Sequence, residues 1–512
     1  MAPSYWLSSA PLPEFPSLGR NLHADVVVIG AGVTGITTAY LLKRAGLRVV
    51  VLDRARAAYG DSGVTTAHLS CVTDVLLQDL VKAFGEDHAR AAWDAGLAAM
   101  WQIAENVDAE RLSCGFAWVP GYLHPPLGKA VEEKDVEQLR TEAKVASALG
   151  FDATFVDRAP FVDMPAVEFS GQARIHPLRY LQGLVAAIDG DGSAIFENTN
   201  VDDIEDDPLR VVAGAHRVTC DHVVVATHNP IVGKAGLLRA TLLQTKLALY
   251  STYVVAGRIA SGRIPDALFW DTSTPYRYLR IERQRDDDLV IYGGEDHKTG
   301  QVSDTSSRFT TLERALAKLV PGIEITDRWS GQVIETADGL PLIGEMAPRQ
   351  FAATGFNGNG ITFGTLAAIM ARDAITGQEN PWRDLFDMSR KKIRGGLWDY
   401  IKENKDYPYY LIRDRFAGAE GKTTRSLGRG VGKILDLDGT RVAAYRHDNG
   451  RVTLLSHVCT HMGCHVKWND AERTWDCPCH GSRFTPTGEV LSGPAEKPLE
   501  ELTAKVAAKA GQ

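Results

Sequence analysis

Four residues near the C-terminal end of the sequence have metal-binding side chains and occur as two closely spaced pairs. Cys459 and His461 lie in the segment CTHMGC, and Cys477 and His480 lie in the segment CPCHGS. Thiolates and imidazoles are ligands for both iron and zinc. A cluster of this density in a reducing compartment points to a metal before it points to a disulfide scaffold.

The ligand types favour an iron–sulfur cluster. Two thiolates on one iron and two imidazoles on the other are the ligand set of a Rieske-type [2Fe–2S] centre. Structural zinc is the alternative, but zinc ligands are usually two to four residues apart, and a single residue separates Cys459 from His461. A Rieske oxygenase would need a mononuclear iron domain after the cluster, and few residues follow His480. We therefore expect an electron carrier whose substrate chemistry lies upstream.

These segments resemble the Rieske proteins of respiratory and photosynthetic cytochrome bc-type complexes. The resemblance implies a disulfide between Cys464 and Cys479, which occupy corresponding positions in the two segments. It also implies that the Ser482 hydroxyl donates to a cluster sulfur and raises the potential. Phe484 stands where those proteins have a tyrosine that gives a second such bond. We therefore expect a potential below the top of the Rieske range, which is about −150 to +300 mV.

A second chemical signature lies near the N-terminal end. Gly30, Gly32 and Gly35 form a GxGxxG motif directly after the apolar run at 26–29. Glycines in such a motif permit a tight turn and let a helix N-terminus approach a pyrophosphate. Asp53 ends the next predicted strand, where a carboxylate can accept hydrogen bonds from an adenosine ribose. The motif predicts a dinucleotide site but does not distinguish FAD from NAD.

Residues 25–377 resemble the D-amino-acid oxidase/glycine oxidase/sarcosine oxidase family of FAD enzymes. The likeness is clearest at the GxGxxG motif, at DHVVVATHNP (221–230) and at DGLPLIGEMAPRQFAATGFNGNGIT (338–362). It implies FAD, with a glycine-rich loop near the flavin and a helix that directs its positive end to the pyrimidine side. Besides the motif glycines and Asp53, the cofactor contacts that it implies are Ser62, Thr65, Thr66, Ala67, Val201, Gly358, Asn359, Gly360, Ile361 and Thr362. Cys71 and His68 match no covalent attachment motif, so we expect dissociable FAD.

The same resemblance implies an antiparallel region that covers the flavin and offers Tyr and Arg side chains to a substrate carboxylate. Tyr276, Tyr278 and Arg280 are spaced so that they would share one face of a strand. Arg280 could bind a carboxylate through two hydrogen bonds. A solvated sheet edge with packed tyrosines is an open alternative. Further candidates for substrate contacts are His176, His297 and Lys298.

These sites require an α/β FAD-binding Rossmann-like domain with an interleaved antiparallel α+β substrate domain, followed by a C-terminal all-β Rieske domain. Period-2 patterns in the last hundred or so residues, together with the hairpin signal Asp448-Asn449-Gly450, support the all-β assignment. The expected divisions are an N-terminal arm at 1–24, an FAD-dependent oxidoreductase (DAO-like) domain at 25–380 with substrate-domain segments near 85–165 and 236–325, a helical linker at 381–417, and a Rieske [2Fe–2S] domain at 418–512.

Length and composition agree with this division. The 512 residues exceed one ordinary core, and 44% apolar with 23% charged residues is typical of a globular protein. The net charge of −8 argues against a nucleic-acid partner. No apolar run is long enough to cross a bilayer, and prolines interrupt the start where a signal peptide needs an apolar core. We therefore expect no membrane span and a cytoplasmic location.

We interpret the chain as an FAD-dependent dehydrogenase of an amino-acid or amine C–N bond that passes electrons from flavin to its own Rieske cluster. A shared chain keeps the effective concentration of the acceptor high. Two alternatives stay open: an electron-transfer component or reductase with a protein redox partner, and an oxygen-using oxidase with a structural or regulatory cluster. The expected partners are a small amine or amino acid and an unidentified electron acceptor, such as a redox protein.

Overall fold

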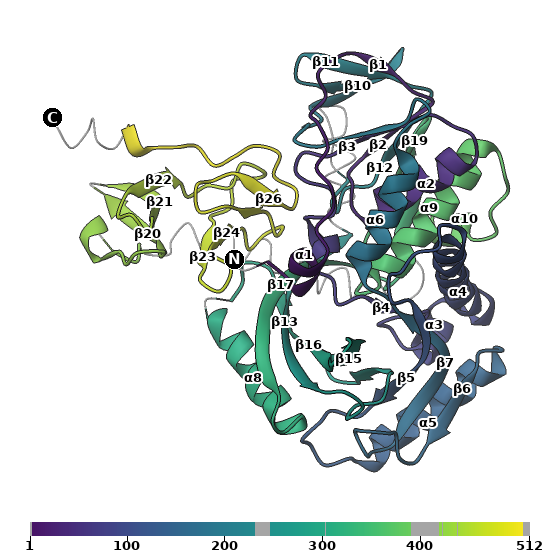
Figure 1. The fold of residues 1–512 in the computed structure, drawn as a ribbon. Coiled ribbons are helices and arrows are strands. Elements are labelled where there is room, and N and C mark those ends of the chain that lie inside the picture. The colour runs from purple at the N-terminus through teal and green to yellow at the C-terminus, as the bar shows by residue number, and fades with distance from the viewer. Residues whose placement is uncertain are drawn as a thin grey trace.

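The computed structural model describes residues 3–230, 246–302, 304–390, 419–421, 423–437 and 439–504. Figure 1 shows the chain from its N-terminus in purple to its C-terminal region in yellow. Of the helical linker expected at 381–417, only the first part, with α10 (Arg383–Phe386), lies within the described residues. The hairpin turn at Asp448–Gly450 joins two paired strands, as predicted.

A mainly parallel sheet carries the GxGxxG motif. Its strands run in the order β18 (Leu342–Ala347), β19 (Gln350–Thr354), β12 (His222–Val225), β2 (Val26–Ile29), β3 (Val49–Leu52) and β8 (Ala194–Phe196), with only the β18–β19 pair antiparallel. Every residue of β2 is buried, and alternate residues belong to two different hydrophobic clusters. The continuous apolar run thus reflects a strand covered on both faces.

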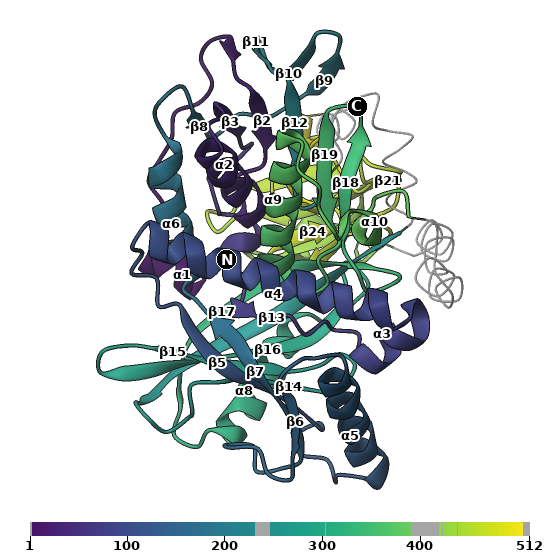
Figure 2. The ribbon, with the colours of Figure 1, turned by 90° about the vertical axis from the view of Figure 1, so that its right-hand side faces the viewer.

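Helices cover one face of this sheet and a small sheet covers the other. The covering helices are α2 (Val33–Arg44), α6 (Pro177–Ile188) and α9 (Gly360–Thr376), and α2 packs on both α6 and α9 (Figure 2). Ile36 and Phe363 join the cluster that contains Val28. On the other face, a small sheet in the order β1 (Leu22–His23), β11 (His216–Thr219), β10 (Leu209–Ala213) and β9 (Asp203–Asp206) contributes to the cluster that contains Val27.

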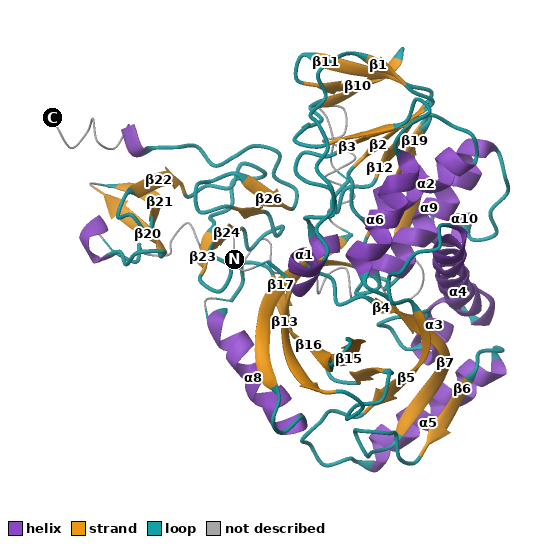
Figure 3. Cartoon of the chain, in the orientation of Figure 1, coloured by secondary structure: helices purple, strands orange, loops and turns teal. Residues whose placement is uncertain are grey.

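A larger, mostly antiparallel sheet forms the interleaved second layer (Figure 3). Its strand order is β17 (Glu324–Thr336), β13 (Leu247–Ala260), β16 (Asp287–Lys298), β15 (Tyr278–Arg283), β14 (Leu268–Asp271), β5 (Ala117–His124), β7 (Ala166–Arg174) and β4 (His68–Leu69), and β6 (Ala153–Val156) also pairs with β7. The accompanying helices are α3 (Leu77–Phe84), α4 (Glu86–Ala109), α5 (Glu133–Ala148) and α8 (Ser306–Leu319). Because α4 packs against α9, it joins this layer to the parallel-sheet layer.

The C-terminal region consists of two small antiparallel sheets, drawn yellow-green in Figure 1. One contains β20 (Gly432–Leu437), β21 (Thr440–Arg446) and β22 (Val452–Ser456), and the other contains β23 (Lys467–Asn469), β24 (Thr474–Asp476), β25 (Arg483–Phe484) and β26 (Val490–Ser492). Short helical turns are η2 (Thr424–Ser426) here, and η1 (Asp61–Gly63) and α1 (Tyr5–Ser9) in the N-terminal part.

The expected fold class is confirmed. None of the described helices has both the length and the apolar character to cross a membrane, and the cytoplasmic location stays a prediction.

Candidate active site

The three glycines of the GxGxxG motif stand where side chains would collide with neighbouring atoms. Gly30 has a φ of +101°, and a Cβ on it would lie 2.9 Å from the Ala226 carbonyl oxygen. A Cβ on Gly32 would lie 3.0 Å from Ser62 Oγ, and one on Gly35 would collide with the Gly30 carbonyl. The absence of side chains leaves an open cradle between β2 and α2 and lets the helix pack closely on the strand, which fits a bound pyrophosphate.

Asp53 lies beside this cradle and organises the loop around it. Its Oδ2 accepts a hydrogen bond from Ala31 N at 2.7 Å, and its Oδ1 accepts one from Ala55 N at 2.8 Å. Burial raises the pKa of Asp53, while both amide bonds favour the carboxylate. The side chain also lines the cavity described next, so it remains available to a ribose.

A cavity of about 2000 Å³ extends from the cradle to the antiparallel sheet. Ordinary small-molecule pockets enclose roughly 300–1,000 Å³, so this one has room for a dinucleotide and a substrate together. Predicted FAD contacts that line it are Gly30, Gly32, Asp53, Ser62, Thr65, Thr66, Val201, Gly358, Asn359, Gly360 and Ile361. The predicted FAD contacts Gly35, Ala67 and Thr362 are not part of the described lining. Of the two side chains considered for covalent attachment, His68 lines the cavity and Cys71 does not.

The glycine-rich loop before α9 enters this cavity. Gly358 adopts a φ of +45°, and Asn359 Nδ2 donates to the Val72 carbonyl at 3.0 Å, which fixes the loop against the segment after β4. Gly360 and Ile361, at the N-terminus of α9, line the cavity. The positive end of the helix dipole therefore faces this cavity, beside the loops predicted to bind the flavin.

The side chains expected to contact substrate separate into two groups. Tyr276 and Tyr278 line the cavity, and their ring centroids are 5.6 Å apart. Arg280 is fully buried and lies outside the described lining, so the expected carboxylate clamp is not formed. Its Nη1 instead donates to the carbonyls of Ala67 at 2.8 Å and Ile175 at 3.0 Å, and its Nη2 pairs with Glu282. Arg280 thereby holds the loop that carries Thr65 and Thr66.

The remaining three candidates for substrate contact lie outside the described cavity lining. His176 is the N-cap of α6, where its Nδ1 accepts from Arg179 N, and its Nε2 is 3.0 Å from Ser9 Oγ. His297 Nε2 is 2.9 Å from Tyr253 Oη. Lys298, beside it at the end of β16, does not reach the cavity either.

Tyr276 and Tyr278 mark what we call the substrate end of the cavity. At this end the structure shows carboxylates that the sequence analysis did not identify. Asp74 and Asp296 both line it. Tyr276 Oη donates to Asp74 Oδ1 at 3.2 Å, and burial raises the pKa of Asp74 to about 6 and that of Asp296 to about 7. The His68 ring packs against that of Tyr278, and burial lowers the pKa of His68 to about 3, so it is neutral. No local motif marks either aspartate, because they come from different strands and loops.

The two Cys/His segments meet in one place at the edge of the C-terminal region. Cys459 and Cys477 are buried free thiols, and the rings of His461 and His480 pack edge to face with centroids 4.9 Å apart. His461 Nδ1 is buried and has no hydrogen-bond partner among the described residues, as a nitrogen reserved for iron would be. This donor set fits a [2Fe–2S] cluster with two thiolate and two imidazole ligands.

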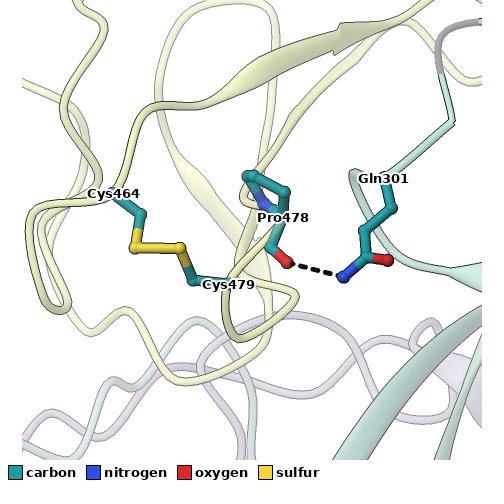
Figure 4. The surroundings of a disulfide bond; sticks show 4 residues. All are labelled: Gln301, Cys464, Pro478 and Cys479. Atoms are coloured by element: carbon teal, nitrogen blue, oxygen red, sulfur yellow. Dashed lines mark hydrogen bonds between the residues drawn. A yellow bond between two sulfur atoms is a disulfide. The ribbon is translucent and has the colours of Figure 1, made fainter. Parts of the chain in front are cut away.

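Cys464 and Cys479 form the disulfide that the sequence resemblance implied (Figure 4). Cys477 Sγ lies within 4.8 Å of both disulfide sulfurs, so the bridge joins the two segments directly beside the ligands. Ser482 is fully buried, and its Oγ accepts from Ala495 N at 3.1 Å. Phe484 is buried in the same hydrophobic cluster as the ligand thiols.

The cluster region forms part of the wall of the flavin cavity. His461 and Thr460 line that cavity together with the segment 489–498. Gln332 of β17 donates through Nε2 to the Gly481 carbonyl at 2.9 Å, next to His480, and also lines the cavity. Thr305 Oγ1 donates to Asn469 Oδ1 at 2.8 Å and adds a second contact between the two parts. Gln301 Nε2 donates to the Pro478 carbonyl at 3.3 Å (Figure 4).

The fold and the two sites define a flavoprotein oxidoreductase joined to an iron–sulfur domain. The chain belongs to the DAO family of FAD dependent oxidoreductases, which matches residues 25–374, and residues 422–503 match the Rieske [2Fe-2S] domain. The first part binds FAD and the second binds a [2Fe–2S] cluster.

Several known proteins are similar to this chain. The putative Rieske 2Fe-2S iron-sulfur protein YhfW of Bacillus subtilis is 33% identical over 98% of this chain and 97% of its own length. The gamma-glutamylputrescine oxidoreductase of Escherichia coli is 25% identical, covering 80% of this chain and 98% of its own. The structure of glycine oxidase from Geobacillus kaustophilus superposes with a TM-score of 0.60 at 18% identity, covering 72% of this chain and 100% of that one.

Proposed function

We propose that this enzyme is a dehydrogenase that oxidises a C–N bond of an amine or amino acid and passes the electrons to its own Rieske cluster. The observation that carries the proposal is the shared cavity wall, since His461, a predicted iron ligand, lines the same cavity as the flavin loops. Bound FAD would accept a hydride from the substrate carbon, and the cluster would take up electrons one at a time. The final electron acceptor is unidentified.

The chain's own residues support this assignment by bringing the two sites together. Gln332 contacts the cluster segment through Gly481, and its side chain also lines the cavity. Leu249 lies beside the same glycine, because a Cβ on Gly481 would come within 2.6 Å of Leu249 Cβ. The two parts of the chain therefore pack directly against each other at this glycine. We propose the residues of both sites as predicted: Cys459, His461, Cys477 and His480 for iron, and the cavity-lining loop residues for FAD.

Anaerobic rapid mixing tests the proposal. The oxidised enzyme is mixed with each member of a panel of amines and amino acids while flavin and cluster absorbance are recorded together. We expect flavin bleaching followed by cluster reduction. The variant Cys477→Ser, which lacks a cluster ligand, should bleach without the second phase. A wild-type cluster that stays oxidised while the flavin is reduced would defeat the proposal, and unchanged peroxide formation in Cys477→Ser under air would favour an oxidase.

A further inference from the structure

The substrate end of the flavin cavity is acidic. Among the described residues that line the cavity, the lysine and arginine side chains are Arg54, Arg56 and Lys497. Arg54 and Arg56 follow Asp53, at the adenosine end, and Lys497 belongs to the cluster region. The antiparallel sheet contributes carboxylates to the described lining and no lysine or arginine. Within the described lining, a substrate carboxylate therefore has no lysine or arginine partner at this end.

A β-bulge directs Asp296 into this space. Ser251 pairs with His297 and Tyr253 pairs with Gly294, so two residues of β16 lie opposite the single residue Thr252 of β13. The first of the two, Glu295, has a φ of +61°. An extra residue of this kind changes which way the following side chains point, and bulges are common next to active sites. Asp296 consequently lines the cavity.

Glu295, the other residue of the bulge, points to a pair of arginines outside the cavity. Its Oε2 accepts from Arg308 Nη1 at 3.2 Å, and its Oε1 accepts from Arg277 Nη2 at 2.6 Å. Asp296 has no such partner: its Oδ1 is buried and makes no hydrogen bond within the described part of the chain. A buried carboxylate oxygen without a donor is costly unless a ligand supplies one. This oxygen is therefore a candidate acceptor for a substrate N–H.

Asp74 is the second carboxylate of this end, and it touches the flavin loop. A Cβ on Gly358 would lie 2.7 Å from Tyr276 Oη and 3.0 Å from Asp74 Oδ2. The tyrosine–aspartate pair is thus adjacent to the loop that approaches the flavin ring. The rings of Tyr276 and Tyr278 stand beside the carboxylates, and the angle between the two ring planes is 54°. Aromatic faces and carboxylates together attract cations.

We infer that the substrate is a cationic amine without a carboxylate next to the reacting carbon, and that Asp296 and Asp74 bind its ammonium group beside the rings of Tyr276 and Tyr278. This inference rests on the proposed function and names its substrate class. The position of Arg280 agrees with it, because this arginine, which the sequence suggested as a carboxylate ligand, donates instead to the Ala67 and Ile175 carbonyls. An amino acid would bring its own carboxylate into a space already lined by Asp296 and Asp74.

Two probes of the same shape and opposite charge test the inference without turnover. tert-Butylammonium carries no hydrogen on the carbon next to nitrogen and cannot be oxidised there, and pivalate replaces its ammonium group by a carboxylate. Each is titrated into the oxidised holoenzyme while the flavin absorbance is recorded. We expect saturable binding of tert-butylammonium and binding of pivalate at least tenfold weaker. Pivalate that binds as tightly as the amine would overturn the inference.

Substitutions assign the binding to the named carboxylates. Asp296→Asn keeps the shape of the side chain and should weaken tert-butylammonium binding at least tenfold with the FAD content unchanged. The control Asp287→Asn removes a carboxylate from the same strand, where Asp287 pairs with Arg258 at the surface, and should bind like the wild type. If Asp296→Asn loses FAD, Asp74→Asn replaces it with the same expected result. Wild-type affinity in both cavity variants would overturn the inference.

Binding to the oxidised enzyme and electron transfer are separate measurements, so the two proposals can fail separately. A tight amine complex with a cluster that never becomes reduced would contradict the proposed function and leave the substrate class intact. Cluster reduction by amino acids together with tight pivalate binding would contradict the substrate class and leave the proposed function intact.

Discussion

The two carboxyl groups near the flavin loop retain their protons at higher pH than surface carboxyls do. Burial raises the pKa of Asp296 to about 7 and that of Asp74 to about 6. The groups that face Asp296 are Thr252, whose hydroxyl favours the carboxylate, and the carboxylates of Asp74 and Glu295, which oppose it. His68 adds no charge because its pKa is about 3. Both aspartates therefore titrate close to neutral pH.

This titration predicts how amine binding depends on pH. An aliphatic ammonium has a pKa near that of lysine, about 10.4, so it stays cationic from pH 5 to 8.5. Binding requires ionised carboxylates, so affinity should be highest above pH 7 and fall as the pH decreases through the pKa of Asp296 and then that of Asp74. Titrations of tert-butylammonium against flavin absorbance at each pH measure this profile. In Asp296→Asn the break near pH 7 should disappear, whereas Asp287→Asn should keep it. Affinity that rises toward low pH would contradict the assignment.

Residue by residue, sequence predicts those roles that depend on local geometry. The glycines of the GxGxxG motif are recognisable because their spacing alone defines the turn, and the structure places a would-be Cβ of Gly30 against the Ala226 carbonyl. Arg280 shows where prediction from local spacing fails. Its spacing from Tyr278 matches one strand face, but its guanidinium is taken by the Ala67 and Ile175 carbonyls from other parts of the chain. Those partners are distant in sequence, so strand alternation does not reveal them.

At the scale of structural elements, the disulfide is the cross-link that holds the two cluster segments together. Cys464 and Cys479 are separated by 15 positions in the sequence. Closing a loop of that length stabilises the folded state by about 3 kcal/mol in the chain-entropy description. Replacing both cysteines in Cys464→Ser/Cys479→Ser leaves Cys459, His461, Cys477 and His480 unchanged. We expect the cluster to be lost at a lower temperature while the flavin transition stays in place.

Thermal unfolding followed at separate cluster and flavin absorbance bands measures this effect. Met462→Ser is the matched control, because Met462 is exposed in the same segment and takes no part in the cross-link. It should keep the wild-type cluster transition. Equal cluster transitions in the double variant and the wild type would mean that the bridge does not stabilise the ligand segments.

The elements themselves differ in how well sequence predicts them. The buried strand β2 follows from its continuous apolar run, and the C-terminal hairpins follow from alternation and turn residues. The bulge in β16 does not follow. It depends on how Glu295 and Asp296 register against Thr252 of β13, and that register is set by packing across the sheet. Asp296 was missed for this reason, although its position decides the charge of the cavity.

At the scale of the whole molecule, the arrangement of the two cofactor sites is the feature that sequence alone could not supply. The ligand motif predicts His461 as an iron ligand, but nothing in either motif indicates that His461 also lines the flavin cavity. That position depends on contacts between residues far apart in the chain, such as Thr305 with Asn469 and Gln332 with Gly481. Each of these hydrogen bonds contributes little to the free energy of folding, so they matter more for positioning the cluster segment than for stabilising the protein.

Gln332 offers a direct test of this positioning. Its Nε2 donates to the Gly481 carbonyl at 2.9 Å and to Thr299 Oγ1 at 3.2 Å, so Gln332→Leu keeps much of the volume but removes both donors. With its docking contact gone, the cluster segment should sample positions farther from the flavin. In anaerobic rapid mixing with a reducing amine, we expect cluster reduction to slow at least tenfold and flavin bleaching to change less than twofold. Gln350→Leu, on β19 and paired with Asp206, should leave both phases unchanged. Equal slowing of both phases in Gln332→Leu would instead assign Gln332 to flavin or substrate binding, and wild-type rates would show that this contact does not position the cluster.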